Sequence, residues 1–372
     1  MAGKDTETLL AYTRQHSSSL CGSAGIQDGS RAAIVNPILR NEELLFGLNG
    51  VSIFSSTNTD AMQLWMEKMG FETGKNRFQY AGATELMDML LGIRYLACRN
   101  TIGLDTPYKK IYSGEYFDLY RNPRVLAGGY LVDSSIQDFR LKEKNPFEVQ
   151  NNLLRHMGGF VLYQTVKVGT LPKQTATAGN IFKLRLKGGQ HGYLWIPGTE
   201  PSAVSINGRI QKYNNWNNNF LDLGYSEKDR IVEVGMTGHS LGNAVLGTFE
   251  QSQMDSIYRK LSQNEVRIRN GRGSIQADRA GILFFGSFYD NGIHVEVDGR
   301  EVKTLNLEGI LGVGVDAGKH EVKISYETPG LKTGAAVTLL CIGVLLAHPI
   351  RSRRGISAIP GRIRVQIKGR KL

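Results

Sequence analysis

An uncharged apolar run near the C-terminus limits the folds that this chain can adopt. Thr333–Ile350 comprises eighteen residues without a charged side chain, and a run of this length is a candidate transmembrane helix. Arg351, Arg353 and Arg354 follow it directly, and a basic cluster beside an apolar run is typical of the cytoplasmic flank of a span. We therefore expect a membrane-spanning helix over residues 331–350, with the preceding body outside the cytoplasm.

The charge is distributed unevenly along the chain. The formal net charge is +11, but from Leu331 onward there are nine lysines or arginines and no acid, which leaves +2 for residues 1–330. A nucleic-acid-binding domain would concentrate cations on a folded face, so we expect no nucleic-acid partner. The basic segment 351–372 is instead expected to lie in the cytoplasm and to contact anionic membrane lipid.

The N-terminal segment lacks the pattern of a signal peptide. Met1–Arg14 is polar and charged, with no apolar stretch before a small-residue cleavage site. A body outside the cytoplasm would then need earlier membrane spans to export it. Two alternatives follow: the chain is tail-anchored and its body lies in the cytoplasm, or the chain is the C-terminal part of a longer membrane protein with earlier spans.

The cysteines and histidines give little indication of disulfide bonds or of a metal site. The chain has three cysteines, too few for a disulfide framework. Cys21 and Cys98 could pair, although nothing in the sequence requires it, and Cys341 lies inside the apolar run. The seven histidines are scattered singly and match no metal-site spacing. We expect no metal and no cofactor.

Local patterns predict an α+β fold rich in strands. Asn58 or Thr59 can cap a helix that stops at Gly70, and a second helix fits residues 84–91 with Gly92 after its end. Asn145 and Pro146 supply the cap and first residue of a further helix through Met157. Beyond about Leu162 almost every segment has the pattern of strand and turn, apart from a helical connector over 249–261.

A near-repeat divides this β-region. Val204–Arg209 (VSINGR) corresponds to the stretch EVDGR at 296–300 with an offset of 91 residues. The repeat predicts two tandem antiparallel β-sandwich modules of jelly-roll-like type. The expected divisions are a small α/β unit (1–105), a β-hairpin and linker helix (106–160), the first sandwich (161–262), the second (263–330), the span (331–350) and the basic tail (351–372).

One short motif suggests a hydrolase. Gly238–Gly242 reads G-H-S-L-G, the form in which lipases present a nucleophilic serine, here Ser240. Asp255 or Asp278 and then His294 or His320 follow in an order that a catalytic triad permits. No βαβ series that could build a hydrolase sheet surrounds the motif, so a surface turn is the favoured interpretation.

Other candidate residues have alternative interpretations as well. Aromatic residues at 193, 195, 213 and 216 could stack on sugar rings, but packing in the core and a polar Asn-rich turn are the favoured interpretation. Asp60, Glu85 and Asp88 are expected near helix starts or on solvent faces, where they complement the helix dipole. The aromatic candidates are Tyr193, Trp195, Tyr213 and Trp216.

Several separated stretches together resemble a known family. They are NRFQYAGATELMDMLLGIRYLA at 76–97, YRNPRVLAGGY at 120–130, NPFEVQNNLL at 145–154, FYDNGIHVEVDGREV at 288–302 and GVDAGKHEVKISYETPGLKTG at 314–334. In this order they resemble the C-terminal half of bacterial YfhO membrane proteins, over most of residues 45–350. The resemblance implies a GT-C-like glycosyltransferase that uses polyprenyl-linked sugars to glycosylate cell-envelope polymers, with its catalytic acid in an earlier part of the protein.

The resemblance transfers no catalytic residue to this chain, and no catalytic, cofactor-binding or metal-binding residue is assigned. We expect the extracytoplasmic C-terminal region of a YfhO-like membrane glycosyltransferase. The expected partners are membrane lipid and, through the catalytic half, a polyprenyl-linked sugar and an envelope polymer. The alternatives are a non-catalytic, membrane-anchored carbohydrate-binding or structural ectodomain and, with less support, a serine hydrolase at Ser240.

Overall fold

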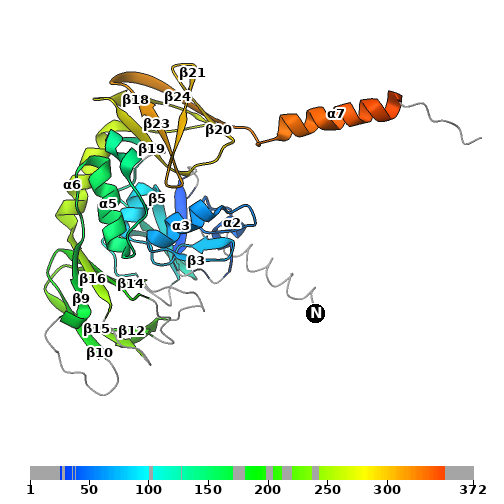
Figure 1. Ribbon diagram of the computed structural model, residues 1–372. Coiled ribbons are helices and arrows are strands. Elements are labelled where there is room, and N and C mark those ends of the chain that lie inside the picture. The colour runs from blue at the N-terminus through cyan, green and yellow to red at the C-terminus, as the bar shows by residue number, and fades with distance from the viewer. Residues whose placement is uncertain are drawn as a thin grey trace, which may run out of the picture. The chain divides into compact units, whose positions relative to one another are not determined.

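The computed structural model describes residues 26, 30–35, 37, 39–99, 104–126, 128–170, 181–197, 204–211, 220–236 and 243–347. The chain forms two units, Met1–Tyr326 and Glu327–Leu372 (Figure 1). The first unit is rich in strands, which are arranged in several sheets. This confirms the prediction of a β-rich fold with helices.

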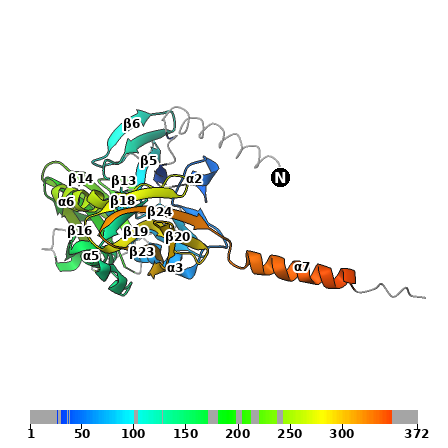
Figure 2. The ribbon, with the colours of Figure 1, turned by 90° about the horizontal axis from the view of Figure 1, so that it is seen from above.

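The N-terminal part of the first unit contains two small sheets. In the four-stranded sheet the order is β1-β5-β7-β6, with β1 parallel to β5 and the other pairs antiparallel; β6 lies at its edge (Figure 2). The strands of both sheets are β1 (Arg31–Val35), β5 (Ile93–Arg99), β6 (Lys109–Ser113) and β7 (Phe117–Arg121), then β2 (Ile53–Phe54), β3 (Glu72–Gly74) and β4 (Arg77–Gln79).

Capping residues set the helices of this part where the sequence predicts them. The Thr59 hydroxyl accepts a hydrogen bond from the Met62 backbone at the start of α3 (Asp60–Lys68), and Thr84 does the same for α4 (Glu85–Leu90). Such caps satisfy backbone N–H groups that lack a partner in the first turn. A short helix, α2 (Glu42–Leu45), precedes them.

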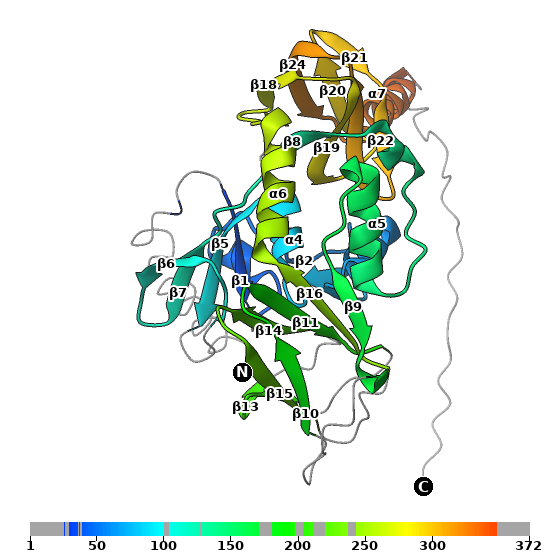
Figure 3. The ribbon, with the colours of Figure 1, turned by 90° about the vertical axis from the view of Figure 1, so that its left-hand side faces the viewer.

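The linker helix is also confirmed. In α5 (Pro146–Gly158) the Asn145 side chain accepts from the Phe147 backbone, and Gly159 closes the helix in the left-handed conformation. A 3₁₀ turn (Ser134–Asp138) precedes it, and α6 (Gln251–Leu261) is the connector expected within the β-region. Figure 3 shows α5 and α6 between the strands β9 and β16 on one side and β8 on the other.

The strands after α5 form two pairs of sheets. In the first pair the orders are β10-β15-β12-β13 and β14-β11-β16-β9, and one hydrophobic cluster contains residues from both sheets. The strands are β9 (Gln164–Lys167), β10 (Ile181–Leu186), β11 (Gln190–Trp195), β12 (Val204–Ile206), β13 (Arg209–Gln211), β14 (Phe220–Ser226), β15 (Arg230–Met236) and β16 (Val245–Glu250).

The second pair has the orders β18-β24-β20-β21 and β17-β8-β19-β23-β22, again around a shared hydrophobic cluster. The strands are β8 (Gly129–Val132), β17 (Glu265–Val266), β18 (Arg272–Ala277), β19 (Gly281–Phe288), β20 (Ile293–Val297), β21 (Arg300–Val302), β22 (Thr304–Leu307), β23 (Ile310–Val315) and β24 (Gly318–Tyr326). Strand β8 comes from the segment expected to be a hairpin and linker. The expected domain boundaries and the jelly-roll-like type remain predictions.

The near-repeat corresponds to matching local structure. In both copies a two-residue turn with positive φ joins two short strands, at Asn207-Gly208 and at Asp298-Gly299. The Asn207 side chain accepts from the Glu233 backbone, as Asp298 accepts from the Glu321 backbone. The strand orders β10-β15-β12-β13 and β18-β24-β20-β21 are equivalent position by position. One sheet of each pair therefore repeats the same strand order and the same hairpin.

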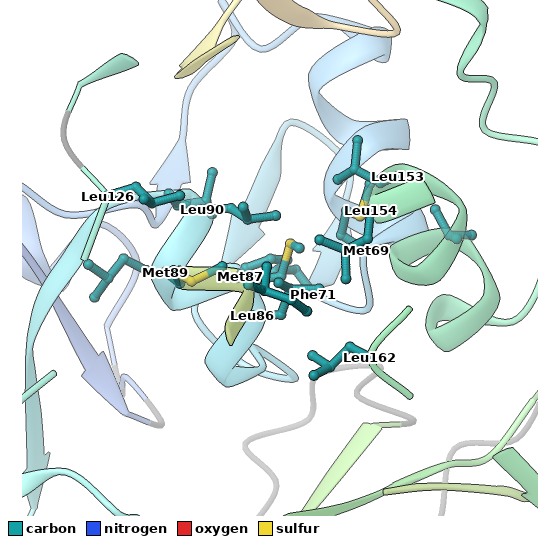
Figure 4. Packing of buried hydrophobic residues seen from close by; sticks show 14 of the residues in the cluster. Met69, Phe71, Leu86, Met87, Met89, Leu90, Leu126, Leu153, Leu154 and Leu162 are labelled. Atoms are coloured by element: carbon teal, nitrogen blue, oxygen red, sulfur yellow. The ribbon is translucent and has the colours of Figure 1, made fainter. Parts of the chain in front are cut away.

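A single large core joins the N-terminal part to both pairs of sheets. It includes buried residues from α3, α4, α5 and α6 as well as from β11, β14, β16 and β19. Figure 4 shows its central part, where Leu86, Met87, Met89 and Leu90 of α4 lie near Met69 and Phe71 and the α5 residues Leu153 and Leu154. Full burial of such side chains contributes roughly 1.5–3 kcal/mol each.

The second unit contains one exposed apolar helix, α7 (Leu331–Ala347), of 17 residues. A span needs about 20 residues at about 1.5 Å per residue. Within the part of the chain that the structure covers, no helix has both the length and the apolar character to cross a membrane. The predicted span over residues 331–350 is thus not found. His348–Ile350 and the basic segment 351–372 lie outside the described residues.

Cys98 is a buried free thiol. Cys21, its partner in the possible disulfide, lies outside the described residues. Burial raises the pKa of Cys98 to about 12, so this thiol is unreactive at neutral pH.

Candidate functional site

A cavity in the first unit lies where the N-terminal sheet meets the first pair of sheets. Its volume is about 800 Å³. The lining comes from α4 and the loop before it, from β6 and β7, and from β11, β14 and the β12–β13 turn; Figure 3 shows β14 next to the sheet of β5, β6 and β7. The polar lining residues used below are Tyr80, Glu85, Asp88, Tyr108, His191 and Asp222.

Helix α4 brings two carboxylates to this cavity. Glu85 and Asp88 are three residues apart and therefore share one face of the helix. Their exposed fractions are 3% and 2%. Both lie in the first turn of α4 as expected, but they are not on a solvent face, because α4 packs on all sides in the central core. Asp60, in the first turn of α3, is exposed as expected.

His191 lies fully buried between two carboxylates. Its Nε2 atom is 2.6 Å from Asp222 Oδ1, and its Nδ1 atom is 2.5 Å from Glu85 Oε1. The ring stacks on Tyr193, with 4.5 Å between ring centroids, and on Phe249, its partner across the β11–β16 pair, at 5.8 Å. Burial by itself lowers the pKa of His191, but the charges of Asp222 and Glu85 outweigh it and raise the pKa to about 10. His191 is therefore an imidazolium at neutral pH.

Glu85 continues this network toward α6. It accepts hydrogen bonds from Arg124 (3.2 Å) and from the Gln251 side chain (2.8 Å). Arg124 also binds Asp255 at 2.6 Å and the Gln251 side-chain oxygen at 2.6 Å. The network thus alternates negative and positive groups from Asp222 through His191, Glu85 and Arg124 to Asp255, as buried charges require.

Asp88 is held separately by two tyrosines. The Tyr80 hydroxyl donates to one of its oxygens at 2.7 Å and the Tyr108 hydroxyl donates to the other at 2.9 Å. Burial raises the pKa of Asp88 to about 7, although both hydroxyls favour the ionised form. The two oxygens of Asp88 already have partners inside the protein.

Asp222 is the carboxylate of this network that remains open to the cavity. Its Oδ1 atom accepts from the Gly224 backbone (2.8 Å) and contacts His191, while its side chain keeps an exposed fraction of 40%. Among the described residues no hydrogen bond to Oδ2 is found. A charged histidine and a backbone N–H therefore fix the carboxylate in place and leave one oxygen to receive a hydrogen bond from a ligand.

Comparison with protein families identifies the chain. A family model described as bacterial membrane protein YfhO matches residues 11–338. The chain belongs to the YfhO family. No curated protein matches it. The resemblance stated from the sequence is thus confirmed.

In this YfhO-family chain, the aromatic residues and the serine motif suggested by the sequence do not form the described site. Tyr193 has an exposed fraction of 1%, and its hydroxyl accepts from the Glu85 backbone, so it packs as a core residue. Trp195 is half-buried against the same core. Tyr213, Trp216 and the motif with Ser240 lie outside the described residues.

The remaining triad candidates of this YfhO-family chain belong to separate ion pairs. Asp255 binds Arg124, and Asp278 binds Arg279 at 3.1 Å. Of the two histidines, His294 contacts Glu301 at 2.7 Å and His320 contacts Asp298 at 2.8 Å. Across the ranges covered by the structure, no group of three or more His, Cys, Asp or Glu side chains is placed to hold a metal ion.

Sequence reasoning missed the residues that form the site. His191 and Asp222 are single polar residues inside strands and belong to no motif. Arg124 stands in the stretch YRNPRVLAGGY, where nothing marks it as a site residue. One signal was available: Gln190-His191 stands at the start of the apolar strand QHGYLW, and Asp222 interrupts FLDLGYS. A charged residue within such a strand needs a partner if it is buried.

Proposed function

We propose that the cavity beside Asp222 binds a sugar or polyol, and that the chain acts in this way within a YfhO-family membrane glycosyltransferase that modifies cell-envelope polymers. The observation that carries the proposal is the fixed, half-open carboxylate of Asp222 at the wall of a cavity of about 800 Å³. A carboxylate held in this manner accepts hydrogen bonds from hydroxyl groups.

The rest of the cavity wall suits the same ligand class. Sugars present hydroxyl groups at their edges and C–H groups on their faces, so their sites combine polar groups with aromatic rings. Tyr80, Tyr108, Tyr120 and Phe220 supply the aromatic part of this lining. The volume exceeds that of one sugar ring, which fits a unit of an oligomer or polymer.

A binding titration tests this proposal. The purified chain is titrated with glucose, N-acetylglucosamine and ribitol by calorimetry, and the experiment is repeated with Asp222→Asn. We expect at least one ligand to bind and the variant to lose affinity by about tenfold or more, because a hydrogen bond to a charged group contributes about 1.5–3 kcal/mol. Asp229→Asn is the control, since Asp229 is an exposed carboxylate paired with Arg185. Binding of none of the three, or equal affinity in wild type and Asp222→Asn, contradicts the proposal.

The proposal also places the first unit outside the cytoplasm, where envelope polymers are modified, and makes membrane lipid, a polyprenyl-linked sugar and the polymer its partners. Its support is the family, which consists of membrane proteins. Protease added to intact cells should then cleave within residues 1–326 of the full protein. Protection of this region in intact cells, together with cleavage after lysis, would overturn the assignment.

A further inference from the structure

A row of charged residues crosses the outer face of the sheet β18-β24-β20-β21. Arg269 pairs with Arg272 across the Asn270-Gly271 turn, and Arg272 lies opposite Lys323 on β24. Lys323 in turn lies opposite Glu296. Directly opposed residues project to the same face of a sheet. Three cations are thus neighbours on one face.

Like charges in this arrangement repel each other, and only one of the three is compensated. The Lys323 ammonium donates to Glu296 at 2.7 Å. For Arg269 and Arg272, both exposed, no ion pair with a carboxylate is found within the described ranges. Opposed like charges are destabilising by a few tenths of a kcal/mol to about 1 kcal/mol.

The related sheet shows that the fold does not need these charges. At the equivalent register of β10-β15-β12-β13 the opposed residues are Ile181, Gly235, Ser205 and Ile210, all uncharged. The cations that do occur on β10 are paired, Lys183 with Glu233 and Arg185 with Asp229. The arginines without an ion pair therefore have no counterpart at the equivalent positions of the sheet β10-β15-β12-β13.

The two arginines also line a hollow of about 800 Å³, together with Arg267, Ser274 and Lys323. Of the three acids of the hollow, Glu265 pairs with Arg267 at 3.0 Å and Glu296 pairs with Lys323. The third, Glu321, lies opposite Ser274, is exposed and has no ion pair within the described residues, so the lining has four cations and three carboxylates. Guanidinium groups present planar sets of donors that match the oxygens of phosphate. The hollow thus offers two adjacent guanidinium groups beside a hydroxyl.

We propose that Arg269 and Arg272 form a binding site for a phosphate or phosphodiester group, carried by a soluble anionic polymer or by a lipid headgroup. The site lies on the second pair of sheets, whereas the sugar site lies against the first pair, so the two proposals stand or fall separately. A polyanion bound at Arg269 and Arg272 would then be held by the same protein chain that binds a sugar beside Asp222.

A comparison of two double variants tests this site. Binding of fluorescently labelled inorganic polyphosphate is measured by anisotropy for the wild-type chain, for R269Q/R272Q and for K183Q/R185Q, which removes the same charge from the related sheet. We expect R269Q/R272Q to weaken binding by about tenfold or more, as loss of a charged hydrogen bond implies, and K183Q/R185Q to change it by less than about twofold, because those side chains are already paired.

Sedimentation with phosphatidylglycerol vesicles, compared with phosphatidylcholine vesicles, identifies the source of the phosphate. Since α7 is present in all three proteins, only the difference between wild type and R269Q/R272Q is informative. A difference with polyphosphate alone supports a soluble polymer, and a difference with vesicles supports a lipid headgroup. Equal losses in both double variants, or no loss in R269Q/R272Q with either probe, would overturn the proposal.

Discussion

Replacing His191 by leucine should lower the free energy of unfolding by about 3–5 kcal/mol, because the change leaves two carboxylates facing each other without the cation between them. Glu85, with an exposed fraction of 3%, cannot be solvated in place. Urea unfolding at pH 7 measures the loss. His294→Leu is the matched control: His294 also contacts a carboxylate, Glu301, but both side chains are exposed, so we expect a change below about 1 kcal/mol. Equal effects of the two substitutions would contradict the charged network.

The same residue predicts a pH dependence. The pKa of His191 rises from its ordinary value near 6.5 to about 10 on folding. Its contribution to stability is therefore fully present below the lower value and is lost as pH increases toward the higher one. Stability of the wild-type chain should fall between pH 7 and 10, and this part of the fall should be absent in His191→Leu. Asp88, whose pKa is about 7, titrates at the lower edge of this window. Since Asp88 is present in both proteins, the difference between wild type and His191→Leu at pH 8–10 reports His191.

Phe147→Ala should cost about 3–5 kcal/mol, the usual range for removing a large buried aromatic side chain. Phe147 is fully buried in α5, with ring centroids 5.1 Å from both Tyr163 and Phe220. The ring also lies so close to Gly247 of β16 that a Cβ atom there would be 2.5 Å from it. The side chain thus joins the linker helix to β14 and β16, and its loss leaves a cavity between them.

Urea unfolding again gives the measurement for Phe147→Ala. Leu44→Ala is the control, since Leu44 is a helix residue with an exposed fraction of 72%, and we expect a change within about 0.5 kcal/mol. A loss below about 1 kcal/mol for Phe147→Ala would show that α5 does not pack on β14 and β16 as described.

Local signals in the sequence predict much of the secondary structure. Thr59, Thr84 and Asn145 mark helix starts because a side-chain oxygen can accept from the first turn, and all three do so in the structure. The turn dipeptides at 207 and 298 mark the related hairpins because Asn, Asp and Gly tolerate positive φ. Each of these signals depends on residues that are near one another in the chain.

The site could not be predicted in this way because its members meet only through the tertiary fold. Glu85 is in the N-terminal part, Arg124 precedes β8, and His191 and Asp222 lie on neighbouring strands of the first pair of sheets. Each appears alone in the sequence as an ordinary polar residue. The predicted span over residues 331–350 is a different case: composition predicts it, and within the described residues the helix Leu331–Ala347 has 17 residues, while His348–Ile350 lie outside them.

Ring ¹⁵N NMR of His191 during the sugar and polyol titrations tests most directly whether the buried charges serve the cavity. At pH 8 both ring nitrogens should carry protons, because the pKa of His191 is about 10, and their signals should move as the bound ligand saturates, since His191 holds Asp222 at the cavity wall. The signals of His156, outside the cavity lining, should stay unchanged. A neutral His191 ring at pH 8, or His191 signals that do not respond to a saturating ligand, would contradict the role given to this network.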